Sequence, residues 1–149
     1  MIWFQEFTPD DIQGLHVNTM PGLLDIAITE VGDDYLVAEM PISHKTVQPF
    51  RTMHGGASAT LAETIGSVAS QMTVDPSKNK CVGLSLNVSH IRAIPEGGKA
   101  IATARPFHIG RTTQVWDIQI TNEEGKIATV SRLTMSVLNM VANNMQRNQ

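Results

Sequence analysis

A polar stretch that runs into a helical pattern contains the residues of this chain best suited to chemistry. It begins at Gln48, ends in His54-Gly-Gly56 and is followed by a segment of small residues that carries one carboxylate, Glu63. The N–H groups at a helix start lack intrahelical acceptors and lie at the positive end of the helix dipole. Glycine there lets a ligand oxygen approach the backbone. These groups suit a carbonyl that becomes an oxyanion while a carboxylate drives water at it.

Hydrolysis of an activated acyl group requires a base or nucleophile, an oxyanion site and a held leaving group. Glu63 supplies the first, and the amides of Gly55 and Gly56 supply the second. The alternative interpretation is structural, with Glu63 as a surface carboxylate and the two glycines as ordinary turn residues. The pattern alone leaves both interpretations open.

The spacing between these groups has a consequence for assembly. Eight residues separate Gly55 from Glu63, which in one helix corresponds to about 12 Å at a rise of about 1.5 Å per residue. One reacting carbon must lie about 3 Å from both groups. Two antiparallel helices packed through their small-residue faces would bring Gly55 of one chain to Glu63 of the other. The sequence therefore predicts a homodimer with two shared sites.

Composition excludes several classes of partner. The chain has 149 residues, and we expect one domain over 1–149 with a frayed tail at 139–149. The net charge of −3 argues against nucleic-acid binding. No signal-peptide pattern and no membrane-length apolar run is found, so we expect a cytoplasmic protein without a membrane partner. The segment from Lys78 to Arg111 contains six basic residues and a single acid, Glu96. This local positive charge suits a small phosphorylated ligand, or the segment is simply a solvated face.

Cysteine and histidine usage predicts neither a disulfide nor a metal site. Cys81 is the only cysteine, and its apolar neighbours predict a buried, inert thiol. The five histidines are scattered along the chain. The sequence also lacks a Walker loop, a dinucleotide fingerprint and a Gly-x-Ser-x-Gly elbow. We therefore expect no metal site.

The main helix is predicted over 57–72. Its apolar residues recur at 3.6-residue spacing, so their arc is expected to face the core: Leu61, Ala62, Ile65, Val68, Ala69 and Met72. The opposite arc is expected to meet a ligand or another subunit, because its residues are mostly small: Thr60, Glu63, Ser67, Ser70 and Gln71. An ordinary exposed face is the alternative.

Period-two alternation replaces the helical spacing after this helix. We expect a short helix at 8–16, a chain break at Pro21-Gly22, a loop over 41–56, and strands at 25–30, 35–40, 82–89, 99–107, 112–121 and 126–138. The short connections between strands predict antiparallel neighbours. The expected fold class is α+β, an antiparallel sheet wrapped around one long central helix.

A family resemblance joins these motifs. The string Gln48-Pro-Phe…His54-Gly-Gly-Ala-Ser…Leu61-Ala-Glu63-Thr-Ile-Gly-Ser67 resembles hotdog-fold acyl-CoA thioesterases. The branch most similar contains 1,4-dihydroxy-2-naphthoyl-CoA hydrolase and the enterobactin-synthesis proofreading thioesterase. The segments 82–90 and 108–116 also resemble that branch, as does the opening Met1-Ile2-Trp3. The resemblance extends to about Leu138.

The resemblance implies hydrolysis of acyl-CoA thioesters by a hotdog dimer that pairs into a tetramer, without metal or organic cofactor. It implies that Glu63 is the nucleophile or general base and that the Gly55 amide polarises the thioester carbonyl. Residues matching Gln48, His54 and Ser67 would orient water, substrate or leaving group. Substrate and coenzyme A contacts are implied at Gly83, His90, Ile91, Arg92, His108, Ile109, Gly110 and Arg111.

Two of these contact residues also have a chemical argument of their own. His90 ends an alternating strand near Arg92, so it suits a pantetheine or phosphate contact, or is an exposed strand histidine. Arg111 follows a glycine in a bend and suits phosphate as a forked donor, or is a surface arginine.

The predicted function is hydrolysis of acyl-CoA thioesters with aryl or bulky acyl groups. 1,4-Dihydroxy-2-naphthoyl-CoA is one candidate, and it would place the protein in menaquinone biosynthesis. One alternative is a hotdog hydratase or dehydratase, which would require a histidine paired with the carboxylate. The other alternative is a non-catalytic acyl-CoA binding module.

Overall fold

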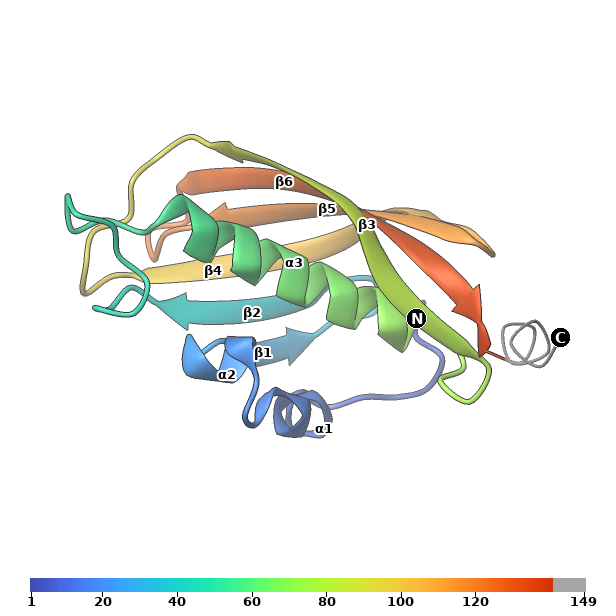
Figure 1. Ribbon diagram of the computed structural model, residues 1–149. Coiled ribbons are helices and arrows are strands. Elements are labelled where there is room, and N and C mark those ends of the chain that lie inside the picture. Colours follow the sequence, from blue (N-terminus) through green and yellow to red (C-terminus); the bar gives the residue numbers. More distant parts are fainter. Residues whose placement is uncertain (141–149) are drawn as a thin grey trace, which may run out of the picture.

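One long helix lies across a six-stranded antiparallel sheet in the computed structural model of the protein, which describes residues 1–140 (Figure 1). The strand order is β1-β2-β4-β5-β6-β3. The strands are β1 (Ala27–Val31), β2 (Leu36–Pro41), β3 (Asn79–His90), β4 (Lys99–Ile109), β5 (Thr113–Thr121) and β6 (Ile127–Asn139). The helices are α1 (Pro9–Gln13), a 3-10 turn (Gly14–His16), α2 (Met20–Leu23) and α3 (Gly55–Met72). The predicted α+β class is confirmed, and every strand pair is antiparallel. The expectation that successive strands are neighbours is wrong for β3 and β4, because β3 pairs with β6 and β4 pairs with β2.

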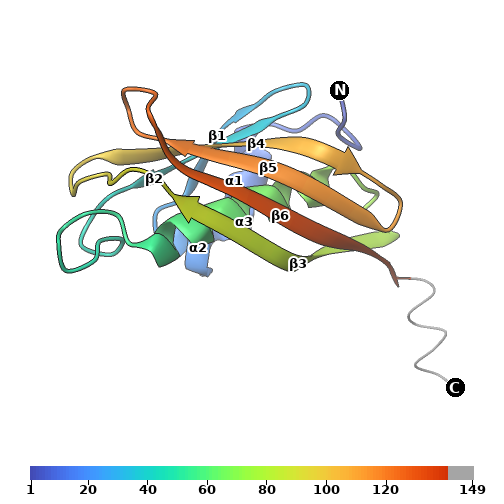
Figure 2. The same cartoon turned by 90° about the horizontal axis from the view of Figure 1, so that it is seen from above.

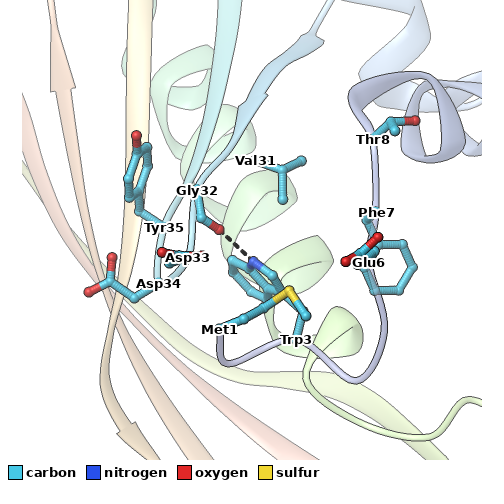
Figure 3. Close-up of a pocket in the computed structure, with 10 residues that line it drawn as sticks. All are labelled: Met1, Trp3, Glu6, Phe7, Thr8, Val31, Gly32, Asp33, Asp34 and Tyr35. Carbon is cyan, nitrogen blue, oxygen red and sulfur yellow. Dashed lines mark hydrogen bonds between the residues drawn. The ribbon is translucent and has the colours of Figure 1, made fainter.

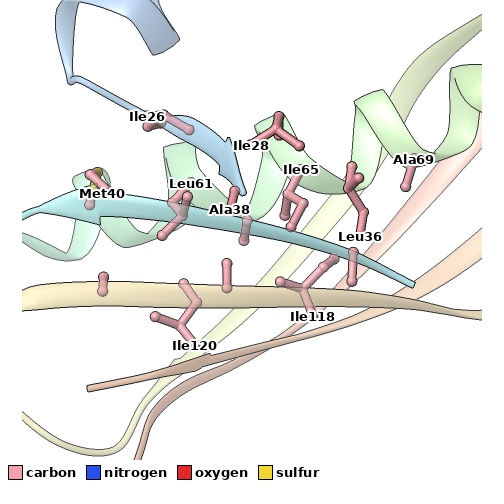
Figure 4. Packing of buried hydrophobic residues seen from close by; sticks show 14 of the residues in the cluster. Ile26, Ile28, Leu36, Ala38, Met40, Leu61, Ile65, Ala69, Ile118 and Ile120 are labelled. Carbon is pink, nitrogen blue, oxygen red and sulfur yellow. The ribbon is translucent and has the colours of Figure 1, made fainter. Parts of the chain in front are cut away.

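The core fills the space between α3 and the sheet. Leu61, Ile65 and Ala69 point from the helix towards apolar residues of β2 and β5 (Figure 4), and all three are fully buried. Burial of a Leu or Ile side chain contributes about 1.5–3 kcal/mol. Gly66 allows the close approach of β6, because a Cβ at this position would lie 2.5 Å from Leu133 Cδ2.

The main helix differs from its predicted form in three respects. It begins at Gly55, two residues before the predicted start. Val68 is only half-buried, although we expected it in the core. Ser70 is fully buried, although we expected it on the ligand-facing arc. The start of β3 crosses this part of the helix, where the Cys81 thiol lies 3.5 Å from the Ser70 carbonyl oxygen, so Ser70 has no access to a ligand.

The N-terminal segment is also more finely divided than predicted. The expected helix over 8–16 is α1 followed by the 3-10 turn, and Thr8 caps α1 in a capping box with Asp11. The predicted break at Pro21-Gly22 is wrong, because α2 runs through it with proline in its first turn. Figure 1 places α1 and α2 beside β1, at the edge of the sheet away from β3.

The strands lie where the alternation predicts them along the chain, but several bounds shift. A register shift between Gly83 and Ser85 interrupts the pairing of β3 with β6. The predicted alternation therefore fails at Leu84, whose side chain is 61% exposed. Asn139, the first residue of the predicted frayed tail, instead ends β6 and pairs with Asn79. The rest of that tail, apart from Met140, lies outside the described residues.

Two features of the sheet bear on the site. β3 is an edge strand that pairs only with β6. The loop before α3 lies at one end of the sheet, while the β4–β5 turn and the end of β6 lie at the other (Figures 1 and 2).

Over the described part of the chain, no helix is long and apolar enough to cross a membrane.

Candidate active site

The loop before α3 is held by a tight turn around Gln48. The Arg51 amide donates to the Gln48 carbonyl oxygen at 2.8 Å, and the Gln48 amide donates to the Thr52 carbonyl oxygen at 2.9 Å. Arg51 has a φ of 60° and forms an ion pair with Glu96 in the β3–β4 connection. The Gln48 side chain is fixed as well, because Nε2 donates to Thr52 Oγ1 at 2.8 Å and Oε1 accepts from the Phe50 amide.

The first turn of α3 leaves one backbone N–H free. The Gly56 amide donates to His54 Nδ1 at 2.8 Å. The amides of Ala57 and Ser58 donate to the His54 carbonyl oxygen at 2.9 and 3.1 Å. The Gly55 amide has no acceptor among the described residues, and as the first helical residue it has none within the helix. It is therefore the amide of this turn that remains available to a ligand oxygen.

His54 and His90 lie on either side of this turn. His54 caps the helix, and because its Nδ1 accepts a hydrogen bond, the neutral ring carries its proton on Nε2. His90 lies against Gly55, since a Cβ on that glycine would be 3.0 Å from His90 Nε2. A depression of 330 Å³ opens here; its lining includes Gln48, Thr52, Gly55, His90, Ile91, Arg92 and Thr129. The structure thus brings together Gln48, Gly55 and the three predicted contacts 90–92.

Glu63 lies further along α3, in a second depression. Its Oε1 accepts a hydrogen bond from Ser67 Oγ at 3.4 Å. The same oxygen lies close to β3, because a Cβ on Gly83 would be 2.5 Å from it. Three predicted residues, Glu63, Ser67 and Gly83, are therefore together. The depression around Glu63 is mostly apolar and is lined by Met20, Pro21, Ala59, Thr60, Thr64 and Leu86.

Gly55 and Glu63 belong to one continuous helix, so they cannot approach each other within a protomer. Eight residues of helix place them about 12 Å apart along the axis. They line separate depressions: the one at Glu63 is mostly apolar, whereas the one at Gly55 combines polar and apolar residues. A single thioester carbonyl cannot contact both groups of the same chain.

The remaining predicted contacts lie at the other end of the sheet: His108 and Ile109 end β4, and Gly110 and Arg111 are in the β4–β5 turn. Positions on β6 show how far apart the two groups lie. His108 is level with Thr134 of β6, through its partner Val115, whereas His90 pairs directly with Thr129 of β6. Five residues of strand correspond to about 17 Å. Within one protomer, the structure does not bring this turn to the other contact residues.

Comparisons with known proteins identify the family. Residues 50–129 match the model of the thioesterase superfamily. The chain is 41% identical to 1,4-dihydroxy-2-naphthoyl-CoA hydrolase of Escherichia coli over 93% of this chain and 100% of the relative. A mutant thioesterase of Pseudomonas aeruginosa has a crystal structure with a TM-score of 0.92 and 40% identity, covering 94% of this chain and 100% of that one. A thioesterase of Haemophilus influenzae gives a TM-score of 0.90 and 43% identity, covering 94% and 96%.

This chain belongs to the thioesterase superfamily. The predicted hotdog fold and the predicted family are thereby confirmed. The protein is a thioester hydrolase, as the family resemblance implied. Over the described residues, this thioesterase has no group of three or more His, Cys, Asp or Glu side chains that would hold a metal ion.

A depression larger than those at Gly55 and Glu63 lies away from the candidate site. It has a volume of 910 Å³ and lies between the N-terminal segment and the β1–β2 turn (Figure 3). Trp3 closes one side, where its Nε1 donates to the Gly32 carbonyl oxygen at 2.6 Å. The carboxylates in the lining are Glu6, Asp33 and Asp34. An acidic surface is unsuited to a phosphorylated ligand, and none of the predicted site residues lies there.

Sequence reasoning missed several residues of the two depressions. Met20 and Leu86 flank Glu63 from α2 and β3, and Thr129 lies on β6 beside His90. Ser58, fully buried in the first turn of α3, contacts His90. Ser58 and Leu86 carried a local signal, because they lie within the recognised motif segments. Met20 had none, since its role depends on how α2 folds back onto α3.

Proposed function

We propose that the protein hydrolyses acyl-CoA thioesters with aryl or bulky acyl groups, in sites that two protomers build together. Glu63 of one protomer and the Gly55 amide of the other act on one thioester carbonyl. The observation that carries this proposal is the free Gly55 N–H at one end of α3 and the Glu63 carboxylate more than two turns away.

The chemistry divides among the residues as follows. Glu63 either removes a proton from water as it attacks the carbonyl carbon, or attacks that carbon itself to form an anhydride that water then hydrolyses. The Gly55 N–H stabilises the oxyanion in either route. Collapse of the tetrahedral intermediate breaks the carbon–sulfur bond and releases the thiolate. His54 supplies an Nε2–H donor beside the Gly55 amide, and Ser67 orients the carboxylate.

The two depressions differ in a way that supports one orientation of the substrate. The depression at Glu63 is walled by Met20, Pro21 and Leu86, which suit an apolar acyl group. The depression at Gly55 contains His90 and Arg92, which suit the polar arm of coenzyme A. Their volumes of about 330 Å³ each fall at the lower end of the range for ligand pockets. We therefore assign the acyl group to the α2 side.

A two-fold dimer with antiparallel α3 helices would complete this site. The Gly55 end of one helix would then lie near the partner's Glu63. The same operation would carry the partner's β4–β5 turn, with Arg111, towards the end of the sheet where His90 lies. The β3 edge, unpaired on its outer side, offers backbone groups for such an interface. This arrangement accounts for predicted coenzyme A contacts at opposite ends of one protomer.

The activity is tested by coenzyme A release from a panel of aromatic and aliphatic acyl-CoAs. We expect turnover of aryl and bulky substrates, and a loss of kcat by at least about 100-fold in Glu63→Gln because the base or nucleophile is gone. Binding of the substrate should survive in that variant. Glu124→Gln, which changes an exposed carboxylate of the β5–β6 turn, is the matched control and should keep full activity. Unchanged hydrolysis in Glu63→Gln would contradict the mechanism, and binding without turnover in the wild type would indicate a non-catalytic acyl-CoA module.

A further inference from the structure

Ser58 and His90 meet beneath the first turn of α3. Ser58 Oγ lies 2.9 Å from the Gly55 carbonyl oxygen and 3.2 Å from His90 Nδ1. Ser58 is fully buried, whereas the His90 ring extends from its Nδ1 side out to the depression at Gly55. The serine therefore holds one edge of an imidazole whose other edge faces the candidate site.

The single proton of the Ser58 hydroxyl decides the roles in this cluster. A carbonyl oxygen can only accept a hydrogen bond, so the shorter contact requires that the hydroxyl donates to Gly55. The hydroxyl then presents lone pairs to His90 Nδ1, which must carry a proton to complete the second contact. A neutral imidazole carries one proton, so Nε2 is left with a lone pair.

The position of this lone pair indicates what it meets. His90 Nε2 lies against Gly55, whose amide we assign to the thioester carbonyl oxygen. The charged residue that shares the lining of this depression is Arg92. In an acyl-CoA, only sulfur and two methylene groups separate the thioester carbon from the first amide of the pantetheine arm. Within the coenzyme A part of the substrate, that amide N–H is the hydrogen-bond donor nearest to the reacting carbon.

We propose that Ser58 is a positioning residue that holds His90 in the Nδ1–H form, so that Nε2 accepts a hydrogen bond from the pantetheine amide. This inference rests on the proposed function for the identity of the ligand. It also distinguishes between the two contacts predicted for His90, one with the pantetheine arm and one with a phosphate group. Phosphate oxygens accept hydrogen bonds, so a neutral His90 in this form favours the amide N–H over a phosphate group.

The tautomer is measured by long-range ¹H–¹⁵N correlation spectroscopy of ¹⁵N-histidine-labelled protein at alkaline pH, where imidazole is neutral. We expect the wild type to show His90 protonated at Nδ1 and Ser58→Ala to shift the proton towards Nε2. Ser58→Thr keeps the hydroxyl and should restore the Nδ1–H form. The matched control is Ser70→Ala, because Ser70 Oγ is buried in the same helix and has no partner among the described residues. A wild-type ring protonated at Nε2, or a tautomer unchanged in Ser58→Ala, would overturn the proposal.

The ligand is tested with acyl thioesters of N-acetylcysteamine and of its N-methyl analogue. In the wild type, N-methylation removes the donor and should raise KM about fivefold with little change in kcat. Ser58→Ala should bind the two thioesters equally, since its His90 no longer offers the lone pair. Equal KM values in the wild type would contradict the amide contact. If no thioester is hydrolysed by the wild type, the proposed function fails, whereas the tautomer measurement still decides the role of Ser58.

Discussion

At the scale of single residues, the free amide of Gly55 carries the oxyanion chemistry. Gly55→Pro removes this N–H, and proline is tolerated at the first position of a helix. We expect kcat to fall by about 100-fold or more, as for loss of an oxyanion donor in other hydrolases. Gly55→Ala is the matched control, because it keeps the N–H. Its Cβ would lie 3.0 Å from His90 Nε2, so it should raise KM modestly and leave most of kcat. Equal kcat values for the two variants would contradict the role of the amide.

The two histidines next to this amide have opposite hydrogen-bonding roles. His54 accepts the Gly56 amide at Nδ1 and therefore donates from Nε2. His90 contacts Ser58 at Nδ1 and, on our proposal, accepts at Nε2. A donor and an acceptor beside one oxyanion amide suit a thioester, which brings a carbonyl or thiolate acceptor and an amide donor. If the two histidines exchanged roles, each would face a substrate group with which it cannot form a hydrogen bond.

Cys81 is half-buried, and burial raises the pKa of its thiol despite the contact with the Ser70 carbonyl oxygen. The thiol is therefore protonated at neutral pH, and we expect iodoacetamide to alkylate the folded protein at least about tenfold more slowly than the protein in urea. The pKa of this thiol is higher in the folded protein than in the unfolded chain, where it is about 8.5. The thiol therefore lowers the free energy of unfolding only when the pH rises above that unfolded-state pKa. Mass spectrometry measures the alkylation rate of the folded protein and of the protein in urea. Equal rates in the two states would refute this assignment.

At the scale of elements, α2 forms one wall of the acyl depression through Met20. Met20→Ala removes apolar contact, so we expect kcat/KM for an aryl-CoA to fall about tenfold while that for acetyl-CoA changes little. Leu23→Ala is the matched control, since Leu23 is in the same helix, is 70% exposed and does not line the depression. The measurement is the ratio of kcat/KM values for the two substrates. An unchanged ratio in Met20→Ala would show that the acyl group binds elsewhere.

Much of this element structure could be predicted from the sequence, because the patterns are long and periodic. The apolar spacing predicts α3, the alternation predicts the strands, and the short connections predict the β1–β2, β4–β5 and β5–β6 pairs. The errors arise where tertiary contacts override local pattern. Ser70 is polar but buried, because β3 crosses it, and Leu84 is apolar but exposed, because a register shift turns it out of the alternation.

The candidate site was predictable to a different extent. Glu63 and Gly55 lie within one motif, whose residue types suit acyl chemistry but leave a structural interpretation open, and the role of Gln48 comes from the family resemblance. Met20 and Thr129 are distant in sequence from that motif and reach the depressions only through folding. Their positions follow from the docking of α2 on α3 and from the register of β6, which no local pattern encodes.

At the scale of the whole molecule, one protomer contains two half-sites that cannot act on the same carbonyl. The polar half-site surrounds Gly55, and the apolar half-site surrounds Glu63 on the same helix. A two-fold dimer pairs each half-site with the opposite half-site of its partner, so both sites of the dimer are complete. We therefore expect a dissociated monomer to be inactive even where it stays folded.

The most direct test of this central claim is the activity of mixed dimers formed from Glu63→Gln and Gly55→Pro chains. Each variant alone forms dimers in which both sites lack one group. A mixed dimer has one site with both defects and one site with an intact Glu63 and an intact Gly55. We predict that mixing by co-expression, with separate tags to isolate the mixed dimer, restores coenzyme A release to about half the wild-type rate per dimer. A purified mixed dimer as inactive as either parent would contradict the account, because each chain would then require both groups for itself.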